Sequence, residues 1–475
     1  MTRQHSPEQQ SPEQQSPEQQ APEPVGASAE TPAATNAAGK FNRSRFARLL
    51  FHSLLTKIVM IALRLIRNAI IARVLGPTDR GLLALITSIP EVIMTIGNLG
   101  YSNSAAWKLA QPGAQPRQVM GAILAFVLIA GTLCAGASLW VIENPWLLRD
   151  NTADLGDWQW IIALAIPLFL VKTIHHNLLL VRDQVNQANL VNLNESLLPL
   201  VFFLLMWGVA GMNGLDASIY SWFVALLLLA IWTTIPLKDM FPPQWDQDTH
   251  KALLGYGVRG HFDTLFQKLM LRIDYFFVSG MVGATALGYY AMATAAAELL
   301  LVLPTAVTFP LYSFLMRNHR DDKRAVTPKV LRIMLVVMIL GALALWITGE
   351  LLIRLLFGDA FLPAYPALVW LLPGMIALGY CSLIRIDLLG ENHPGSVSVV
   401  SGACVALNMG LNLVLTPAYG IEGTAAAATI SYLIAAAALA WLHWRITGIP
   451  AHESMLVRPS DFAEITRYLR KKRAD

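Results

Sequence analysis

The sequence Arg64-Leu-Ile-Arg-Asn-Ala-Ile-Ile-Ala-Arg-Val-Leu-Gly-Pro-Thr-Asp-Arg-Gly81 decides which fold we expect. It ends an apolar run, from about residue 46 to residue 75, that is long enough to cross a bilayer. Lys57, Arg64 and Arg67 lie well inside this run, and at about 100° per residue they share one face of a helix. An arginine at the bilayer centre costs about 3 kcal/mol on insertion scales, so these cations need partners or water. We therefore predict a membrane helix whose basic face borders a water-filled cavity that accepts anions.

A simpler interpretation of this basic face is also open. Lys57 could extend to the lipid headgroups, while Arg64 and Arg67 pair with acidic residues of other helices. For Arg73, at the end of the run, extension to the headgroups is the arrangement that we expect.

The composition independently predicts a polytopic membrane protein. Of the 475 residues, 55% are hydrophobic and only 14% are charged. The N-terminus is polar, so we expect the first membrane helix to direct insertion. Cys134, Cys381 and Cys404 lie inside apolar runs, so we expect neither a disulfide framework nor a metal site. The sequence holds no Walker loop, zinc motif or dinucleotide fingerprint, and we expect no cofactor, no ATP hydrolysis and no nucleic-acid partner.

Beyond residue 40, twelve segments are apolar and long enough to span a membrane. Lys and Arg concentrate before the first segment, after the eighth and at the C-terminus, which all fall on one side if the spans alternate. The positive-inside rule then predicts that both termini are cytoplasmic. The twelve predicted spans are 47–75, 82–106, 118–142, 158–181, 190–211, 215–237, 253–282, 285–316, 328–357, 366–389, 395–417 and 421–444.

The two ends of the chain differ from the spans. Residues 1–40 begin with three copies of Ser-Pro-Glu-Gln-Gln and become rich in Ala and Pro, which predicts a disordered cytoplasmic tail. The tail serves as a tether or, alternatively, binds a partner. Residues 446–475 end in a basic stretch, for which we consider an amphipathic helix on the inner membrane surface or a solvated charged run.

Glycine pairs indicate an internal repeat. Gly76–Gly81 and Gly283–Gly288 share one spacing, and 283 − 76 = 207. Gly211–Gly214 and Gly420–Gly423 share another, and 420 − 211 = 209. Two pairs at nearly one offset predict that the second half of the membrane region repeats the first.

The fold that we predict is therefore all-α. It has 12 transmembrane helices in two six-helix bundles, residues 41–237 and 253–445, joined by a cytoplasmic linker at 238–252. Because six is even, both bundles enter from the same side and are related by a pseudo-two-fold axis along the membrane normal.

Several acidic residues lie inside the predicted spans. Glu91 and Glu298 fall near mid-depth, and with Asp274 they are candidates for ion coupling or for countering the arginines. The seventh span is charged on both faces, so it cannot be turned to lipid and must sit between the bundles or partly in the interface. Within it, Arg259 and Asp263 are spaced i, i+4 and form the plainest ion-pair candidate.

Other polar residues of the spans have structural interpretations. We expect Glu195, Arg385 and Asp387 to form internal pairs or to lie at the interface. His175 and His176 are expected to be polar cavity or interface residues, although adjacent histidines can also titrate near neutral pH.

Three parts of the chain resemble a known family. Ile71–Ala84 resembles the first-loop signature of the polysaccharide-type flippases of the multidrug/oligosaccharidyl-lipid/polysaccharide exporter superfamily. Arg272–Phe277 followed by Gly288–Ala293 resembles the second-half repeat of that signature, and Leu411–Ala427 resembles the signature of the eleventh and twelfth helices. Together they cover residues 45–445.

The resemblance implies a fold like that of the multidrug and toxic compound extrusion (MATE) transporters. Two six-helix bundles would rock around a central cavity, and the cargo would be a sugar linked to undecaprenyl diphosphate. Arg67 looks like one of the essential first-helix arginines of the lipid II flippases, whereas Arg64 does not fall on their other one. Those flippases usually have fourteen spans, so the length favours the oligosaccharide branch.

We therefore expect a flippase for an undecaprenyl-diphosphate-linked oligosaccharide in the bacterial cytoplasmic (inner) membrane, serving surface or exopolysaccharide synthesis. A diphosphate cannot cross hydrocarbon unaided, and a basic, wet cavity can replace its hydration. The expected partners are this cargo, membrane lipid, and the polymerase and glycosyltransferases of the same pathway. The candidate diphosphate ligands are Lys57, Arg64, Arg67, Lys268 and Arg272, and the candidate sugar ligands are Asn192 and Asn194.

Two alternatives remain open from the sequence. A cation-coupled efflux antiporter of the same superfamily would use Glu91 or Glu298 as its ion site, but the basic face disfavours a cationic cargo. A membrane polymerase or glycosyltransferase usually needs a substantial external loop, and the largest one here, residues 143–157, is short.

Overall fold

The computed structural model describes residues 43–147, 155–317, 320–391, 393–455 and 458. The predicted tail at 1–40 and the predicted basic helix at the C-terminus lie outside these residues. For residues 43–58 only the backbone is described. Residues 54–475 form one compact unit, and every contact given below lies within it.

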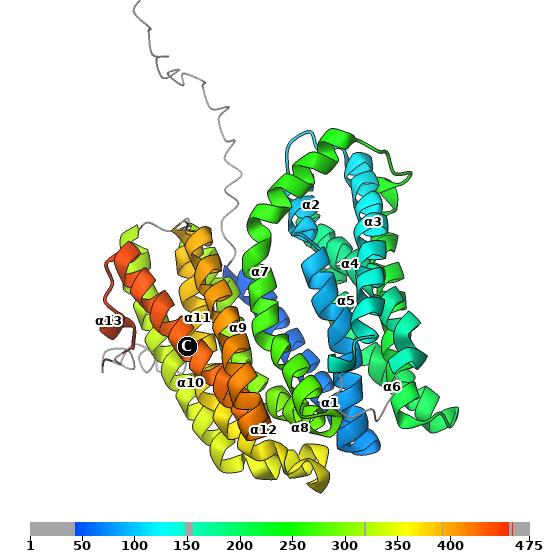
Figure 1. Ribbon diagram of the computed structural model, residues 1–475. Coiled ribbons are helices and arrows are strands. Elements are labelled where there is room, and N and C mark those ends of the chain that lie inside the picture. Colours follow the sequence, from blue (N-terminus) through cyan, green and yellow to red (C-terminus); the bar gives the residue numbers. More distant parts are fainter. Residues whose placement is uncertain (1–42, 148–154, 318–319, 392, 456–457, 459–475) are drawn as a thin grey trace, which may run out of the picture. The chain divides into compact units, whose positions relative to one another are not determined.

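Two very long helices are each bent at a glycine (Figure 1). α1 (Arg43–Gly97) bends at Gly76, whose φ is 70°, and α12 (Pro394–Thr447) bends at Gly420, whose φ is 59°. Glycine adopts positive φ without the steric penalty of a side chain, and Pro77 has the fixed φ that suits the first turn of the next arm. A straight helix of α1's 55 residues would be about 80 Å long, far more than a hydrocarbon core of about 30 Å. Each bent helix therefore has two arms of membrane-spanning length.

The other helices follow one another with short connections, and six 3₁₀ or π segments extend or join them. These short segments are η1 (Pro145–Leu147), η2 (Leu155–Trp158), η3 (Leu204–Val209), η4 (Ile235–Met240), η5 (Glu298–Leu301) and η6 (Asp359–Phe361). The helices are α2 (Tyr101–Leu109), α3 (Pro116–Ile142), α4 (Gln159–Val181), α5 (Val185–Phe203), α6 (Gly214–Thr234), α7 (Gln247–Met281), α8 (Ala284–Ala297), α9 (Val302–Arg317), α10 (Arg320–Phe357), α11 (Ala364–Gly390) and α13 (Ala451–Met455).

Within the described residues, eight helices are long and apolar enough to cross a membrane. The bent pair Val59–Gly97 and Tyr101–Leu109 raises the number to nine. The chain is thus a multi-pass, all-helical membrane protein. The count falls short of twelve because α12 is counted as one helix, α1 enters only as half of the bent pair, and α7 carries too many charges. All twelve predicted spans lie mainly on helical segments, but twelve crossings stay a prediction.

Buried apolar residues form two clusters that hold the helices together. One gathers α8, α11 and α12 around the second arm of α1, with Leu85 and Tyr290 fully buried. The other lies mainly among α2, α3 and α4, with Ile123 and Leu178 fully buried.

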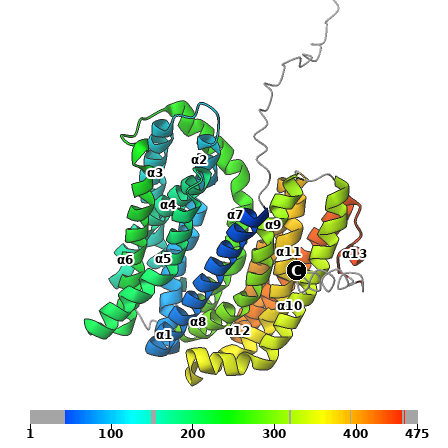
Figure 2. The ribbon, with the colours of Figure 1, turned by 180° about the vertical axis from the view of Figure 1, so that it is seen from behind.

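The second arm of α1 and helix α8 make a reciprocal contact at their first turns (Figures 1 and 2). The Oγ1 atoms of Thr78 and Thr285 lie 2.8 Å apart. A Cβ atom added to Gly81 or to Gly288 would come within 1.9 Å of a backbone carbonyl oxygen of the opposite helix. Each of these residues stands 207 positions from its counterpart, so the repeat seen in the sequence corresponds to a contact of two-fold character. The division into two six-helix bundles itself stays a prediction.

Helix α7 contacts segments from the first half of the sequence at both of its ends. Near its N-terminus, the rings of Tyr256 and Trp107 of α2 stack with their centroids 4.1 Å apart. Near its C-terminus, the Ser279 hydroxyl donates to the carbonyl oxygen of Leu147 at 2.7 Å. Between these points α7 packs on α12 and α8. This placement agrees with the expectation that a helix charged on both faces is not turned to lipid.

Candidate functional site

The basic face of α1 lies beside α5. Arg67 Nη1 is 3.5 Å from the carbonyl oxygen of Glu195, at the outer limit of a hydrogen bond. The Glu195 carboxylate accepts a hydrogen bond of 2.7 Å from Lys172 of α4. Arg64, one turn before Arg67, is exposed. We name Arg64, Arg67, Lys172 and Glu195 the front cluster.

The front cluster carries more positive than negative charge, since three cations face one carboxylate. Lys172 already occupies that carboxylate. In the part of the chain that the structure describes, neither Arg64 nor Arg67 forms an ion pair with an acidic side chain. Their guanidinium groups are therefore available to an anion, and their planar donors suit phosphate oxygens. The side chain of Lys57, the third cation predicted on this face, lies outside the described residues.

The structure corrects our expectation for Arg73. Its guanidinium group donates to the carbonyl oxygens of Leu355 and Leu356, with a distance of 3.0 Å from Nε to Leu356. These carbonyls lie in the last turn of α10, where a helix has no internal donors left for them. Arg73 therefore caps another helix. Extension to the headgroups was the wrong prediction, because the sequence does not show that the end of α10 is within reach.

Lys268 and Arg272 of α7 have carboxylate partners. Glu91, in the second arm of α1, pairs with Lys268 and lies 3.5 Å from Arg272 Nε. Glu298 accepts a hydrogen bond of 2.8 Å from Arg272 Nη1. We name these four residues the bridging cluster. Its two cations and two carboxylates balance, so of the two roles considered for Glu91 and Glu298 the geometry favours countering positive charge.

Arg80 belongs near the bridging cluster, although the sequence did not single it out as a site residue. It lies within electrostatic range of Arg272 and Tyr275. Its Nε is buried and finds no hydrogen-bond acceptor among the described residues. An unsatisfied buried donor is costly unless a ligand or water meets it. The signal in the sequence that could have identified Arg80 is its position just after Gly76 and Pro77. There the second arm of α1 begins and contacts α8.

Asp274 forms a third group, with neutral partners. It is buried and accepts hydrogen bonds from Tyr290 Oη at 2.7 Å and from Asn412 Nδ2 at 2.8 Å. Asn412 also contacts Asn408 Oδ1 at 3.1 Å and accepts from Thr416 at 2.8 Å. No Lys or Arg of the described residues forms an ion pair with Asp274. It therefore does not pair with a cation of the described residues, and its role in ion coupling stays a prediction. We name these five residues the buried aspartate cluster.

The two candidate sugar ligands lie on α5, in the same turns as Glu195. Asn192 and Asn194 are half-buried. Their role stays a prediction, because nothing in the structure shows a sugar.

The predicted pair within α7 does not form. Asp263 accepts from Arg385 of α11 at 2.6 Å and from Gln267 at 3.0 Å, while Arg259 is exposed. The prediction of an Arg259–Asp263 pair was wrong because a cation on a neighbouring helix is better placed. The expectation that Arg385 is internally paired is confirmed.

One further expectation, for Asp387, is met inside the helices. Asp387 pairs with His443 at 2.8 Å, and both side chains are buried. His175 is buried and its Nδ1 lies 3.0 Å from the Thr234 hydroxyl, while its predicted place at a cavity or at the interface stays a prediction.

Comparison with known proteins assigns the family. Residues 70–366, more than half of the chain, match the family described as "Polysaccharide biosynthesis protein". The chain belongs to this polysaccharide biosynthesis protein family. A protein of Shigella flexneri named "Putative O-antigen transporter" is 23% identical over 342 residues, which cover 66% of this chain and 78% of that protein.

The fold of this family member is similar to that of solved transporters. The lipid II flippase MurJ in an inward closed conformation matches with a TM-score of 0.70 and 15% identity, over 82% of this chain and 86% of MurJ. A multidrug resistance MATE transporter in an inward-facing conformation matches with a TM-score of 0.65 and 14% identity, over 82% of this chain and 98% of the transporter. At these identities the likeness concerns the fold. It confirms the predicted MATE-like architecture.

Proposed function

We propose that this member of the polysaccharide biosynthesis protein family is a flippase. Its cargo is an oligosaccharide linked to undecaprenyl diphosphate, which it moves across the bacterial cytoplasmic membrane for surface or exopolysaccharide synthesis. The family, the relative named for O-antigen transport and the transporter fold all support this proposal. The observation that carries it is the pair Arg64 and Arg67, which lies in a membrane helix without a carboxylate partner among the described residues.

The chemistry of the cargo matches this pair. A diphosphate presents several anionic oxygens, and two adjacent guanidinium groups can bind them with charge-assisted hydrogen bonds. The prenyl chain is apolar and stays in the bilayer while the headgroup moves. Asn192 and Asn194 on α5 would then meet the sugar.

The bridging cluster supplies the second part of the path in this proposal. Lys268 and Arg272 are held by Glu91 and Glu298 in this conformation. A diphosphate that arrives from the front cluster would take the place of these carboxylates on the two cations. Arg80, whose Nε lacks an acceptor among the described residues, would bind beside them. The energy source is proposed to be a cation or proton that binds at the buried aspartate cluster.

The direct test replaces Arg64 and Arg67 separately with alanine in a strain that lacks the chromosomal gene. We expect loss of surface polymer, accumulation of the lipid-linked precursor, and an unchanged amount of protein in the membrane. Arg259→Ala is a matched control, because Arg259 is an exposed arginine of a membrane helix outside the proposed path. Normal polymer export by Arg67→Ala would refute the assignment. Drug resistance with unchanged polymer would indicate the efflux antiporter.

The orientation and the partners belong to the same proposal. Both termini are proposed to be cytoplasmic, and the polymerase and glycosyltransferases of the pathway are the proposed protein partners. A polymerase or glycosyltransferase activity of the chain itself is not supported, because the fold it shares is that of transporters.

A further inference from the structure

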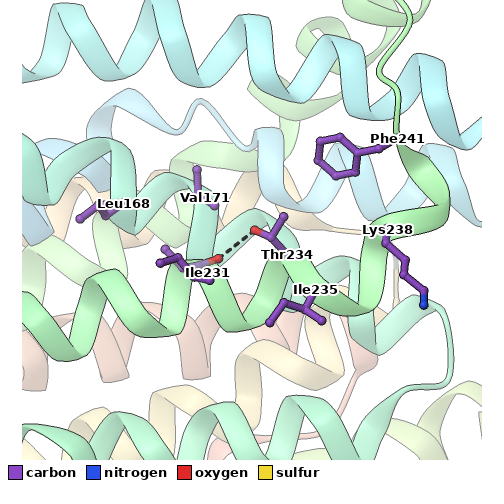
Figure 3. Close-up of a pocket in the computed structure, with 8 residues that line it drawn as sticks. Leu168, Val171, Ile231, Thr234, Ile235, Lys238 and Phe241 are labelled. Carbon is purple, nitrogen blue, oxygen red and sulfur yellow. Dashed lines mark hydrogen bonds between the residues drawn. The ribbon is translucent and has the colours of Figure 1, made fainter.

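An apolar groove lies along α4 and α6 (Figure 3). Its volume is about 470 Å³, within the range of sites for small molecules. The residues that line it come from α4, α6 and η4 and include Leu168, Val171, Ile231, Thr234, Ile235 and Lys238.

Apart from Lys238, one of the described residues that line the groove has a polar side chain, and its hydroxyl is already engaged. Thr234 is the polar residue in its wall, and its hydroxyl donates to the carbonyl oxygen of Ala230 at 2.8 Å. The hydroxyl oxygen of Thr234 also lies 3.0 Å from His175 Nδ1. Because the hydroxyl is already engaged, the wall suits a hydrocarbon chain and disfavours a polar ligand.

One end of the groove carries a cation. Lys238 lies there in η4, its side chain is exposed, and it forms no ion pair with any described residue. The neighbouring charges are already matched, since Arg182 binds both carboxylate oxygens of Asp239 at 2.9 and 2.7 Å. A hydrocarbon groove that ends in one unpaired ammonium group is complementary to an anionic amphiphile.

We propose that this groove is a binding site for an anionic phospholipid of the cytoplasmic leaflet. One acyl chain lies along α4 and α6, and the phosphate contacts Lys238, which begins the proposed cytoplasmic linker. The cargo is not the occupant, because its diphosphate would be held at the front cluster. That cluster includes Lys172, which points from α4 toward Glu195 on α5, while its neighbour Val171 lines the groove. The lipid site does not depend on the identity of the cargo.

The test is native mass spectrometry of the purified full-length protein in detergent, with phosphatidylglycerol or phosphatidylcholine added. We expect the wild-type protein to retain more phosphatidylglycerol. Lys238→Gln should lower its apparent affinity about fivefold, to the level of phosphatidylcholine, as expected for loss of one basic residue at a membrane surface. Lys251→Gln, at an exposed lysine of α7 outside the groove, should leave retention unchanged.

A second variant tests the groove itself. Ala230 also lines the groove, so Ala230→Phe places a ring in the cavity and should reduce retention of both lipids. If this variant does not fold, Ile235→Trp at the exposed edge serves the same purpose. Equal retention of the two lipids by the wild-type protein, or wild-type retention by Lys238→Gln, would overturn the proposal. Displacement of bound phosphatidylglycerol by undecaprenyl phosphate would also overturn it, because the groove would then belong to the prenyl chain of the cargo.

Discussion

Single residues show how this protein distributes charge inside a membrane. Arg272 and Arg385 each have a carboxylate within 2.8 Å, as a buried cation needs. Arg67 instead meets a backbone carbonyl at 3.5 Å, and Arg64 is exposed. Arg272 and Arg385 therefore stabilise the fold through ion pairs, whereas Arg64 and Arg67 keep donors for an anionic ligand.

Arg80 gives a prediction at this scale. Arg80→Ala should reduce polymer export at least tenfold with normal membrane insertion, because an unsatisfied guanidinium donor is removed from the proposed path. Arg80→Lys should restore part of the export, since the charge is kept and the planar donors are lost. Export equal to wild type in Arg80→Ala would show that this side chain serves packing alone. The measurement is surface polymer, with membrane protein quantified in parallel.

Asp274 gives a second prediction at the residue scale. Asp274→Asn keeps the size of the side chain but removes the charge, so the protein should fold while transport loses its dependence on the driving ion. The measurement is uptake of lipid-linked cargo into proteoliposomes with and without an ion gradient. Asp248→Asn, in the exposed first turn of α7, is the control. An unchanged gradient dependence in Asp274→Asn would remove ion coupling from the buried aspartate cluster.

Among the elements, the contact of α1 and α8 depends on a close approach of two backbones. Gly81 and Gly288 allow the two backbones to touch, and no larger residue fits without separating the helices. If α1 and α8 separate during transport, this contact must break and form again.

A cross-link tests that requirement. With Cys134, Cys381 and Cys404 replaced, Thr78→Cys and Thr285→Cys should form a disulfide, because the hydroxyl oxygens lie 2.8 Å apart. We expect oxidation to stop polymer export and reduction to restore it. Each single variant should be insensitive to oxidant. Export that continues in the fully cross-linked protein would mean that α1 and α8 stay together throughout the cycle.

Across the whole molecule, much of the architecture could be predicted from the sequence. The glycine spacing indicated the repeat, and its offset of 207 reappears in the Thr78–Thr285 contact. The partners of charged residues were harder to predict. An i, i+4 pair is visible in the sequence, whereas a partner on another helix depends on how the helices pack. Asp263 therefore pairs with Arg385, and Arg73 caps α10, against expectation.

The number of crossings is a prediction at the same scale. Single cysteines, in a background without the native ones, can be tested with a membrane-impermeant thiol reagent in intact and broken cells. Twelve crossings require Ala114 and His393 inside, and Ala210 and Ala360 outside. If the charged helix α7 did not cross, Ala360 would be inside and His393 outside. These positions lie in or beside connections between helices.

The bend at Gly76 has a mechanical consequence. The arginines that would meet the cargo first and Glu91, which holds two cations of α7, sit on opposite arms of one continuous helix. A movement of the first arm is therefore transmitted to the second arm through the bend alone, because no loop lies between the two arms. A substitution that stiffens the bend would therefore separate binding of the cargo from release of the two α7 cations by Glu91, even with every charged group still in place.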